Sequence, residues 1–380
     1  MHLEKLSLIN FKNYVQADFN YSARLNCFVG NNGTGKTNLL DAIHYLSLTK
    51  SYFNLVDSQN IRYDADFFMI QGTFQMKQRT ETVSCSVQRN RKKKFSRNKK
   101  DYKRLAEHIG LLPVVMISPS DSAIVTEGSE ERRKFMDTVI SQYDRSYLDD
   151  LIHYNRALVQ RNKLLKTFAK EERYLPESLE LWDEQLIPPG ERIFKKRVDF
   201  IQKLIPKFQK YYETISLRNE QIGLEYRSQL YNSDFREKLV QCREKDRILQ
   251  YSTVGIHKDD LELKLDNRPI KRVGSQGQQK TFLVSLKFAK FDFIRDITGK
   301  QPILLLDDIF DKFDAKRVEQ IIQIISNPEF RQIFITDTHK TRLENILTRI
   351  KADYKVFRIN DKVTEIEKDE PDNSNVHETK

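Results

Sequence analysis

One glycine-rich octapeptide constrains this chain more than any other feature of its sequence. The segment GNNGTGKT, residues 30–37, satisfies the full P-loop pattern G-x-x-x-x-G-K-T. It follows the apolar run Leu25–Val29, which predicts a buried strand, and it opens a stretch at Lys36–Leu48 with apolar residues at helical spacing. A phosphate-binding loop requires this order of strand, loop and helix, whereas a chance glycine-rich turn does not.

The P-loop pattern assigns a role to each residue of the loop. Its glycines let the backbone turn so that successive N–H groups surround the phosphates. Lys36 would neutralise the β- and γ-phosphates, and the Thr37 hydroxyl would bind magnesium. We therefore expect ATP and Mg²⁺ as cofactors. The residues of this loop expected to contact the nucleotide are Gly30, Asn31, Asn32, Gly33, Thr34, Gly35, Lys36 and Thr37.

A second segment, ILLLDDIFDKFD at residues 303–314, ends an apolar run in two carboxylates. The run predicts a strand, and Asp307 at its carboxyl end is expected to reach the same magnesium ion. Asp308 would then orient or deprotonate the attacking water. An acidic pair can simply end a strand, but together with an intact P-loop it predicts hydrolysis of the nucleotide.

A third segment, SQGQQK at residues 275–280, stands at the predicted start of a helix. The pattern alone is compatible with ordinary helix capping. Lying between the P-loop and the acidic strand, it resembles the signature motif of ABC-type ATPases. That resemblance implies that Ser275, Gly277 and Gln278 meet the γ-phosphate held by the P-loop of a second subunit, aided by the helix dipole. The expected catalytic residues are Lys36, Ser275, Asp307 and Asp308.

Further stretches make the chain resemble the RecF family over nearly its whole length. They are LSLINFKNY near the N-terminus, PVVMISPSDSAIVTEGSEERRKFMD at residues 113–137, and GIHKDDL at residues 255–261. Transporter ATPases lack these stretches, and chromosome-organising ATPases carry a far longer inserted arm. The resemblance implies an α/β fold: an ABC-type P-loop ATPase head with a mixed sheet, split by a mainly helical arm domain. The expected domains are residues 1–125 for the first half of the head with a basic hairpin, 126–250 for the arm, 251–365 for the second half of the head, and 366–380 for a disordered acidic tail.

The same resemblance implies a function in recombinational DNA repair, replication restart and the SOS response. Such a protein recognises gapped DNA at junctions of single and double strands, and helps RecO and RecR place RecA there. ATP binding would form a homodimer, and weak DNA-stimulated ATP hydrolysis would release it. Two alternatives stay open: an ABC-type ATPase without a DNA role, and a DNA clamp that uses ATP only as a structural ligand.

Some positions depart from the wider ABC-type pattern. Asp308 stands where most members have glutamate, whose reach is longer. The segment DKFD at residues 311–314 replaces the usual Ser-Glu-Leu-Asp of the loop through which two subunits touch. His339, after the apolar run at residues 333–335, is either a switch residue that senses the γ-phosphate or a solvated loop histidine.

The middle of the chain predicts helices. Apolar residues recur at helical spacing over residues 130–168 and again after Pro176 as far as residue 208. A strand is predicted at residues 222–226 and a further helix at 233–249. This insertion is too short for a long two-stranded arm of sustained heptads.

The charge of the chain points to a polyanionic partner. The 65 Lys and Arg against 54 Asp and Glu leave a net charge of +11. Residues 89–104 hold ten Lys or Arg and one acid, so this stretch is either a sequence-independent DNA contact or an exposed solubilising hairpin. Arg132 and Arg133 would bind phosphate or pair with Glu130 and Glu131. The expected DNA contacts are Arg91, Lys92, Lys93, Lys94, Arg97, Lys99 and Lys100.

The cysteines and the apolar runs bear on the cellular compartment. Three cysteines, at positions 27, 85 and 242, form neither a zinc pattern nor a disulfide framework, which fits a reducing compartment. The longest apolar runs have the length of a strand, so we expect no membrane span. The sequence thus predicts a cytoplasmic protein.

Overall fold

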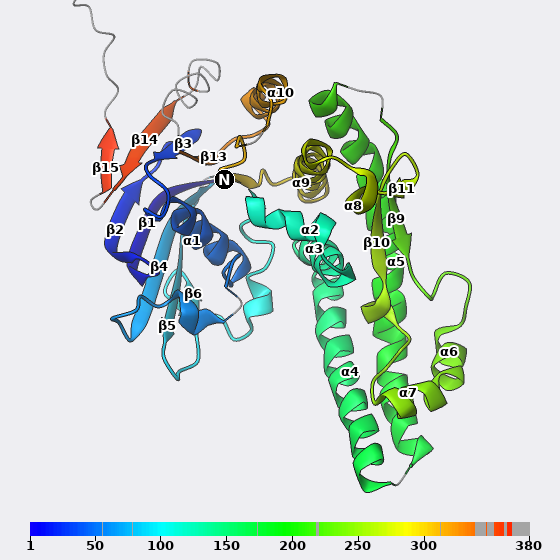
Figure 1. Cartoon of the computed structure of the whole chain (residues 1–380). Helices are drawn as coiled ribbons and strands as arrows, with labels where there is room; N and C mark the ends of the chain where they lie inside the picture. Colours follow the sequence, from blue (N-terminus) through cyan, green and yellow to red (C-terminus); the bar gives the residue numbers. More distant parts are fainter. Residues whose placement is uncertain are drawn as a thin grey trace, which may run out of the picture. The chain divides into compact units, whose positions relative to one another are not determined.

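The computed structural model describes residues 1–54, 56–77, 79–172, 174–217, 220–311, 313–338, 347, 353–360 and 363–366, the last segment without its side chains. His339 and the tail expected beyond residue 366 lie outside the described residues. The chain forms two compact units (Figure 1). The first unit comprises Met1–Lys103, Pro302–Asp311 and Ile322–Lys380, and the second comprises Arg104–Gln301 and Lys312–Ile321.

The first unit carries two sheets. One is antiparallel, in the order β2-β1-β4-β5-β6-β7. The other contains the order β15-β14-β3-β13-β12; β14, β3, β13 and β12 pair in parallel, and β15 is antiparallel to β14. The elements of this unit are β1 (His2–Phe11), β2 (Tyr14–Asn20), β3 (Leu25–Val29), α1 (Lys36–Leu48), η1 (Asp57–Asn60), β4 (Phe67–Met76), β5 (Arg79–Gln88), β6 (Lys94–Arg97), β7 (Lys100–Asp101), β12 (Ile303–Asp307), β13 (Ile333–Asp337), β14 (Tyr354–Ile359) and β15 (Val363–Ile366). The predicted α/β fold with a mixed sheet is confirmed.

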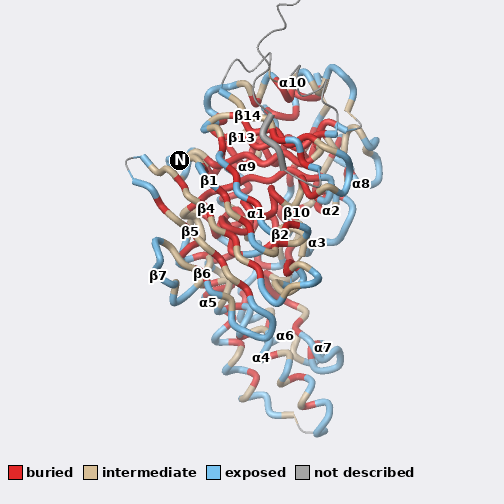
Figure 2. The backbone as a smooth tube through the Cα atoms, turned by 90° about the vertical axis from the view of Figure 1, so that its left-hand side faces the viewer, coloured by how far each residue is buried: buried red, intermediate tan, exposed pale blue. Residues whose placement is uncertain are grey.

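The core of the first unit lies between these sheets. Every residue of β3 is buried, as expected for a strand with parallel partners on both sides. Phe19 of β2 packs edge-on against Phe28 of β3 and Phe357 of β14, so aromatic rings join one sheet to the other. Helix α1 contacts strands of both sheets and is buried along most of its length (Figure 2). The P-loop is therefore anchored at both ends by buried structure.

The second unit is mainly helical. Helices α4 and α5 pack side by side along the arm, and α5 also contacts α9 (Figure 1). The elements of this unit are η2 (Leu105–Glu107), β8 (Val114–Ile117), η3 (Pro119–Ser122), α2 (Ala123–Thr126), α3 (Ser129–Ser141), α4 (Arg145–Glu171), α5 (Pro176–Ser216), β9 (Ile222–Arg227), α6 (Phe235–Gln241), α7 (Arg243–Leu249), η4 (Ile256–Lys258), β10 (Asp260–Leu265), β11 (Arg268–Pro269), α8 (Ile270–Val273) and α9 (Gln276–Thr298). Helix α10 (Ala315–Ser326) begins in this unit and ends in the other.

Two predicted helical stretches are interrupted. The first is broken after α3, and Asp144 caps the next helix by accepting a hydrogen bond from the Tyr147 N–H at 3.1 Å. The helix predicted at residues 233–249 is two short helices that meet at Cys242. The packing units also differ from the expected domain boundaries, because residues 251–301, expected in the head, belong to the same unit as the arm.

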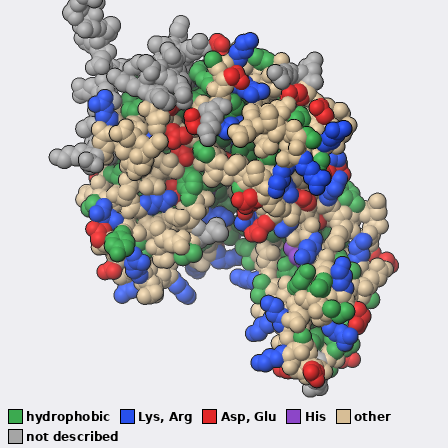
Figure 3. All heavy atoms as spheres, viewed as in Figure 1, with side chains coloured by type: hydrophobic (Ala, Val, Ile, Leu, Met, Phe, Trp, Pro, Cys, Tyr) green, Lys and Arg blue, Asp and Glu red, His purple; other side chains and the backbone are tan. Residues whose placement is uncertain are grey.

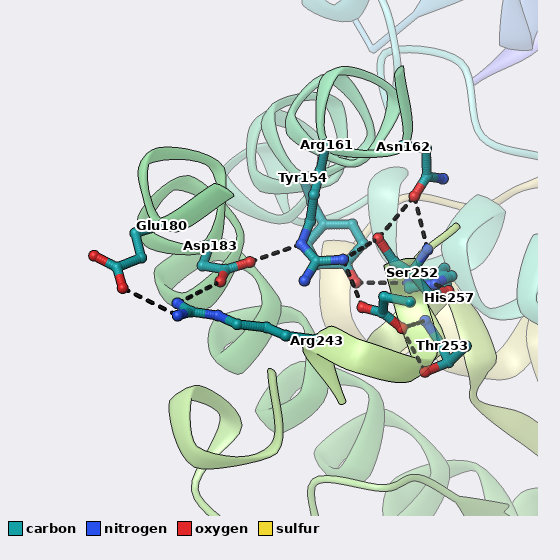
Figure 4. A network of polar contacts seen from close by, with 10 residues as sticks. Tyr154, Arg161, Asn162, Glu180, Asp183, Arg243, Ser252, Thr253 and His257 are labelled. Carbon is teal, nitrogen blue, oxygen red and sulfur yellow. Dashed lines mark hydrogen bonds and ion pairs between the residues drawn. The ribbon is translucent and has the colours of Figure 1, made fainter. Parts of the chain in front are cut away.

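A buried polar network ties the arm helices to the segment after α7 (Figure 4). Arg161 of α4 is fully buried and donates to Asp183 of α5 at 2.7 Å and to Asp246 of α7 at 2.6 Å. Its guanidinium also donates to the Ser252 hydroxyl at 2.8 Å. The spacing of apolar residues predicts which face of a helix is buried, but it does not predict this buried charged network.

No helix among the described residues is long and apolar enough to cross a membrane.

Candidate functional site

The P-loop leaves β3 and holds its own lysine. The Lys36 ammonium is buried and donates to the carbonyl oxygens of Gly30 and Asn31, both at 2.9 Å. Gly35, which precedes α1, has a φ of 104°, and a Cβ there would lie 2.3 Å from Asn13 Nδ2. Glycine is needed at this position both for its backbone conformation and for the close approach of Asn13.

The turn between β1 and β2 braces this loop, a role that sequence reasoning missed. Asn13 Nδ2 donates to the Thr34 carbonyl at 3.0 Å, and the Tyr14 hydroxyl donates to the Gly35 carbonyl at 3.1 Å. Asn38, in the first turn of α1, donates to Asn13 Oδ1 at 2.7 Å. Asn13 and Tyr14 end the N-terminal segment LSLINFKNY, and these two polar residues could have indicated the contact with the P-loop.

A cavity of 710 Å³ lies beside the braced loop. Its size suits a nucleoside, and it opens next to the P-loop residues that would hold the phosphates. The residues that line it are Asn13, Tyr14, Val15, Gln16, Ala17, Asp18, Phe19, Asn20, Gly33, Thr34, Arg62, Phe357 and Asn360.

The acidic strand meets the P-loop at the predicted magnesium ligands. The Thr37 hydroxyl donates to Asp307 Oδ1 at 2.7 Å. The Thr336 hydroxyl donates to the same oxygen at 3.0 Å and accepts a hydrogen bond from the Asp308 N–H, also at 3.0 Å. Hydroxyl and carboxylate oxygens are ligands that Mg²⁺ prefers, so the residues present fit this ion. Sequence reasoning missed Thr336, although a polar residue at the end of a buried strand was a visible signal.

Asp308 has the electrostatic environment of a proton acceptor. Burial raises the pKa of its carboxyl, and the neighbouring Asp307 carboxylate raises it further, while the Lys36 ammonium opposes both effects. Its backbone has a φ of 44°, which is uncommon for a residue with a side chain. The structure thus brings Lys36, Thr37, Asp307 and Asp308 together in the first unit.

The predicted signature residues lie at the start of α9 in the second unit. Ser275 caps the helix: its hydroxyl oxygen accepts from the Gln278 N–H at 3.2 Å, and its own N–H donates to Gln278 Oε1 at 2.7 Å. The capping box uses the Ser275 oxygen as an acceptor, which leaves the hydroxyl hydrogen to be donated to an anion. Gln278 Nε2 is held by Glu220 at 3.0 Å.

Arg132 and Arg133 pair with the GIHKDDL segment instead of with Glu130 and Glu131, and contact with phosphate stays a prediction. Arg132 forms a two-pronged ion pair with Asp260, at 2.7 and 3.0 Å. Arg133 donates to the Asp259 carbonyl at 2.6 Å, and Lys134 instead pairs with the neighbouring glutamates. The arginine pair therefore anchors the GIHKDDL segment to α3.

The basic stretch forms a hairpin of β6 and β7 at the end of the antiparallel sheet. Lys93 does not belong to its exposed surface, because its ammonium donates to the Thr49 carbonyl at 2.6 Å and pairs with Asp57 at 2.8 Å. Arg97 makes a two-pronged ion pair with Glu81. Basic side chains stand at the lower edge of the first unit in Figure 3. The expected DNA contacts that are exposed are Arg91, Lys92, Lys94, Lys99 and Lys100.

Structural comparisons place this architecture among known ATPase heads. A solved structure described as the recombination mediator protein RecF with ATP, in the RecFOR pathway, superposes with a TM-score of 0.87 at 28% identity, covering 96% of this chain and 97% of that one. An Smc head bound to the C-terminal winged-helix domain of ScpA superposes with a TM-score of 0.58 at 14% identity, a likeness of fold alone.

Sequence comparisons are more specific. A family model described as the RecF/RecN/SMC N terminal domain matches residues 2–365. The DNA replication and repair protein RecF of Bacteroides fragilis (strain YCH46) is 52% identical over 361 residues, covering 94% of this chain and 96% of that protein. RecF of Flavobacterium johnsoniae is 46% identical, covering 94% of this chain and all of that protein. The chain therefore belongs to the RecF family of DNA replication and repair proteins, which are built on an ABC-type ATPase head.

Proposed function

We propose that this chain binds and hydrolyses ATP in order to close a homodimer on gapped DNA. The observation that carries the proposal is the 2.7 Å hydrogen bond between Thr37 and Asp307, which joins the P-loop to the acidic strand with Asp308 beside it. A P-loop used for binding alone does not need a carboxylate with a raised pKa next to the metal ligands.

Each candidate site residue of the first unit has a role in this proposal. Lys36 exchanges the two loop carbonyls for the β- and γ-phosphate oxygens, which are stronger acceptors because they are charged. Thr37 and Asp307 would hold Mg²⁺, which neutralises charge on the phosphates when it is bound. Asp308 accepts the proton of the attacking water. The cavity beside Asn13 and Thr34 takes the nucleoside.

The signature residues complete the site from a second copy of the chain. Ser275 would donate its hydroxyl hydrogen to the γ-phosphate, and the N-terminus of α9 adds the partial positive charge of its dipole. ATP therefore joins two subunits, and hydrolysis separates them. The exposed part of the basic hairpin would contact the DNA backbone without reading sequence.

Membership of the RecF family supports the cellular setting that we propose. The protein would act in the cytoplasm at junctions of single- and double-stranded DNA, and would help RecO and RecR place RecA there. Repair, replication restart and the SOS response would follow from that step.

The catalytic assignment is tested with two variants of the first unit. Lys36→Ala should abolish binding of a fluorescent ATP analogue, because it removes the cation that holds the triphosphate. Asp308→Asn should bind the analogue normally, release phosphate at least tenfold more slowly and accumulate the ATP-bound dimer. Wild-type turnover in Asp308→Asn would show that another group accepts the proton.

The composite site is tested by mixing two inactive proteins. Ser275→Arg should bind ATP as a monomer yet fail to dimerise in light scattering with a non-hydrolysable analogue. Mixed with Lys36→Ala protein, it would form dimers with one intact site, because both defects fall in the other site. A Ser275→Arg dimer as tight as the wild type would rule out this arrangement.

The DNA assignment is tested by charge reversal. Changing Lys92, Lys94 and Lys99 to glutamate should weaken binding to single-stranded, duplex and gapped DNA, and should flatten the salt dependence by about one log–log unit per lost phosphate contact. Lys77→Glu, in the β4–β5 turn, is the matched control. Unchanged affinity would assign the DNA surface to other residues, and no preference for gapped DNA would favour an ATPase without a DNA role.

A further inference from the structure

The helix that follows the acidic strand contributes an arginine to the signature motif. Helix α10 begins at Ala315, and the Arg317 side chain lies against Gly277 of α9. A Cβ on Gly277 would lie 2.6 Å from Arg317 Nη1 and 4.0 Å from Ser275 Oγ. The guanidinium and the serine hydroxyl therefore border the same point, and the guanidinium stands where a side chain at position 277 would have to go.

A weak ion pair holds Arg317 in this place. Its Nη1 lies 3.3 Å from Asp314 Oδ2, longer than the 2.7 and 3.0 Å contacts of the two-pronged pair between Arg132 and Asp260. The Asp314 side chain is 56% exposed, so water screens the pair. Asp314 has a structural task as well, since its Oδ1 accepts the Arg317 N–H at 2.9 Å. A doubly charged anion at the serine would be a stronger partner for the guanidinium than this carboxylate.

The signature motif has a need for such a cation. Ser275 and Gly277 bring only partial charges to the γ-phosphate. The Glu220 carboxylate, which accepts from Gln278 and from the Tyr212 hydroxyl, adds negative charge to the same neighbourhood. An arginine matches phosphate oxygens with two parallel donors and cannot lose its charge near neutral pH.

We propose that Arg317 binds the γ-phosphate together with Ser275 when the ATP-bound dimer forms, leaving Asp314 as it does so. The inference rests on the proposed function, because it requires a second copy to deliver the phosphate. Arg317 thereby adds a unit positive charge to the partial charges of Ser275 and Gly277 in the signature half of the composite site. Exchange between Asp314 and phosphate makes the start of α10 sensitive to whether the γ-phosphate is present.

The test compares Arg317→Gln with Lys316→Gln, a change at the exposed neighbouring position. Both variants should bind a fluorescent ATP analogue within twofold of the wild type, because the P-loop is untouched. Arg317→Gln should weaken dimerisation with a non-hydrolysable analogue at least tenfold and lower kcat at least tenfold. Arg317→Lys should recover part of both losses, and Lys316→Gln should lose neither.

Asp314→Asn distinguishes phosphate binding by Arg317 from a purely structural role of the Arg317–Asp314 ion pair. If Arg317 binds phosphate, removing the competing carboxylate should lower the ATP concentration needed for dimerisation. If the pair only holds α10 in place, Asp314→Asn should reproduce the loss seen in Arg317→Gln, and the inference is overturned. It is also overturned if Arg317→Gln matches Lys316→Gln while the wild type dimerises with ATP. A wild type that does not dimerise with ATP would refute the proposed function and this inference together.

Discussion

Replacing Arg161 with methionine should destabilise the arm strongly, because it leaves a buried carboxylate without its cation. The Arg161 and Asp246 side chains are both fully buried, and Asp183 is 5% exposed. Without Arg161, Asp183 keeps a contact with Arg243 at 3.2 Å. Among the described residues, Asp246 then keeps the neutral donors of Thr253, at 2.8 and 2.6 Å.

The expected loss follows from the burial of that carboxylate. Removing one partner of a buried ion pair costs about 3–5 kcal/mol, whereas an exposed pair contributes about 0–1 kcal/mol. The matched control is Arg236→Met, which breaks the Arg236–Glu184 pair in the same arm. Those two side chains are 55% and 53% exposed.

The assay is urea unfolding of the full chain, followed by tryptophan fluorescence. Trp182 is the one tryptophan of the sequence and precedes Asp183 on α5, so it reports on the arm. With a urea dependence of about 3 kcal/mol per M, the midpoint for Arg161→Met should fall by roughly 1 M or more. A shift no larger than that of Arg236→Met would refute the claim that this charge pair stabilises the arm.

Other predictions follow from single contacts. Burial lowers the pKa of His257 from 6.5 to about 4, so the unfolded chain takes up a proton at a higher pH than the folded chain does. The free energy of unfolding should therefore decrease by about 3 kcal/mol as the pH falls from 6.5 to 4. His257→Gln should lack this contribution to the pH dependence of urea unfolding. Burial lowers the pKa of Lys290 to about 7, so Lys290→Met should have a higher free energy of unfolding than the wild type at pH 7. This difference should decrease as the pH rises to 10, because the unfolded wild type then loses its proton as well. Equal urea midpoints of the two proteins at pH 7 would contradict this. Asn13→Ala removes the hydrogen bond to Thr34 and should weaken ATP-analogue binding about tenfold, and unchanged affinity would show that the loop needs no brace.

The sequence alone determined the parts of this protein that depend on local pattern. The P-loop, its flanking strand and helix, the acidic strand and the capped start of α9 lie where spacing predicted them, because each is a continuous segment with its own periodicity. The family resemblance was equally visible in short continuous motifs. The fold class followed from the same motifs, because the family that they resemble has an α/β ATPase head.

Only the tertiary structure decided which side chains meet. Lys93 and Lys94 are neighbours in a basic run, yet one is held by Asp57 and the other is exposed. Arg317 reaches Gly277, and Arg161 reaches Asp246, across long stretches of intervening chain. Periodicity records which face of an element is apolar, but the partner of a charged side chain depends on how those faces pack together. The sequence therefore identified the principal residues of the candidate site, whereas packing determined which charged side chains contact them.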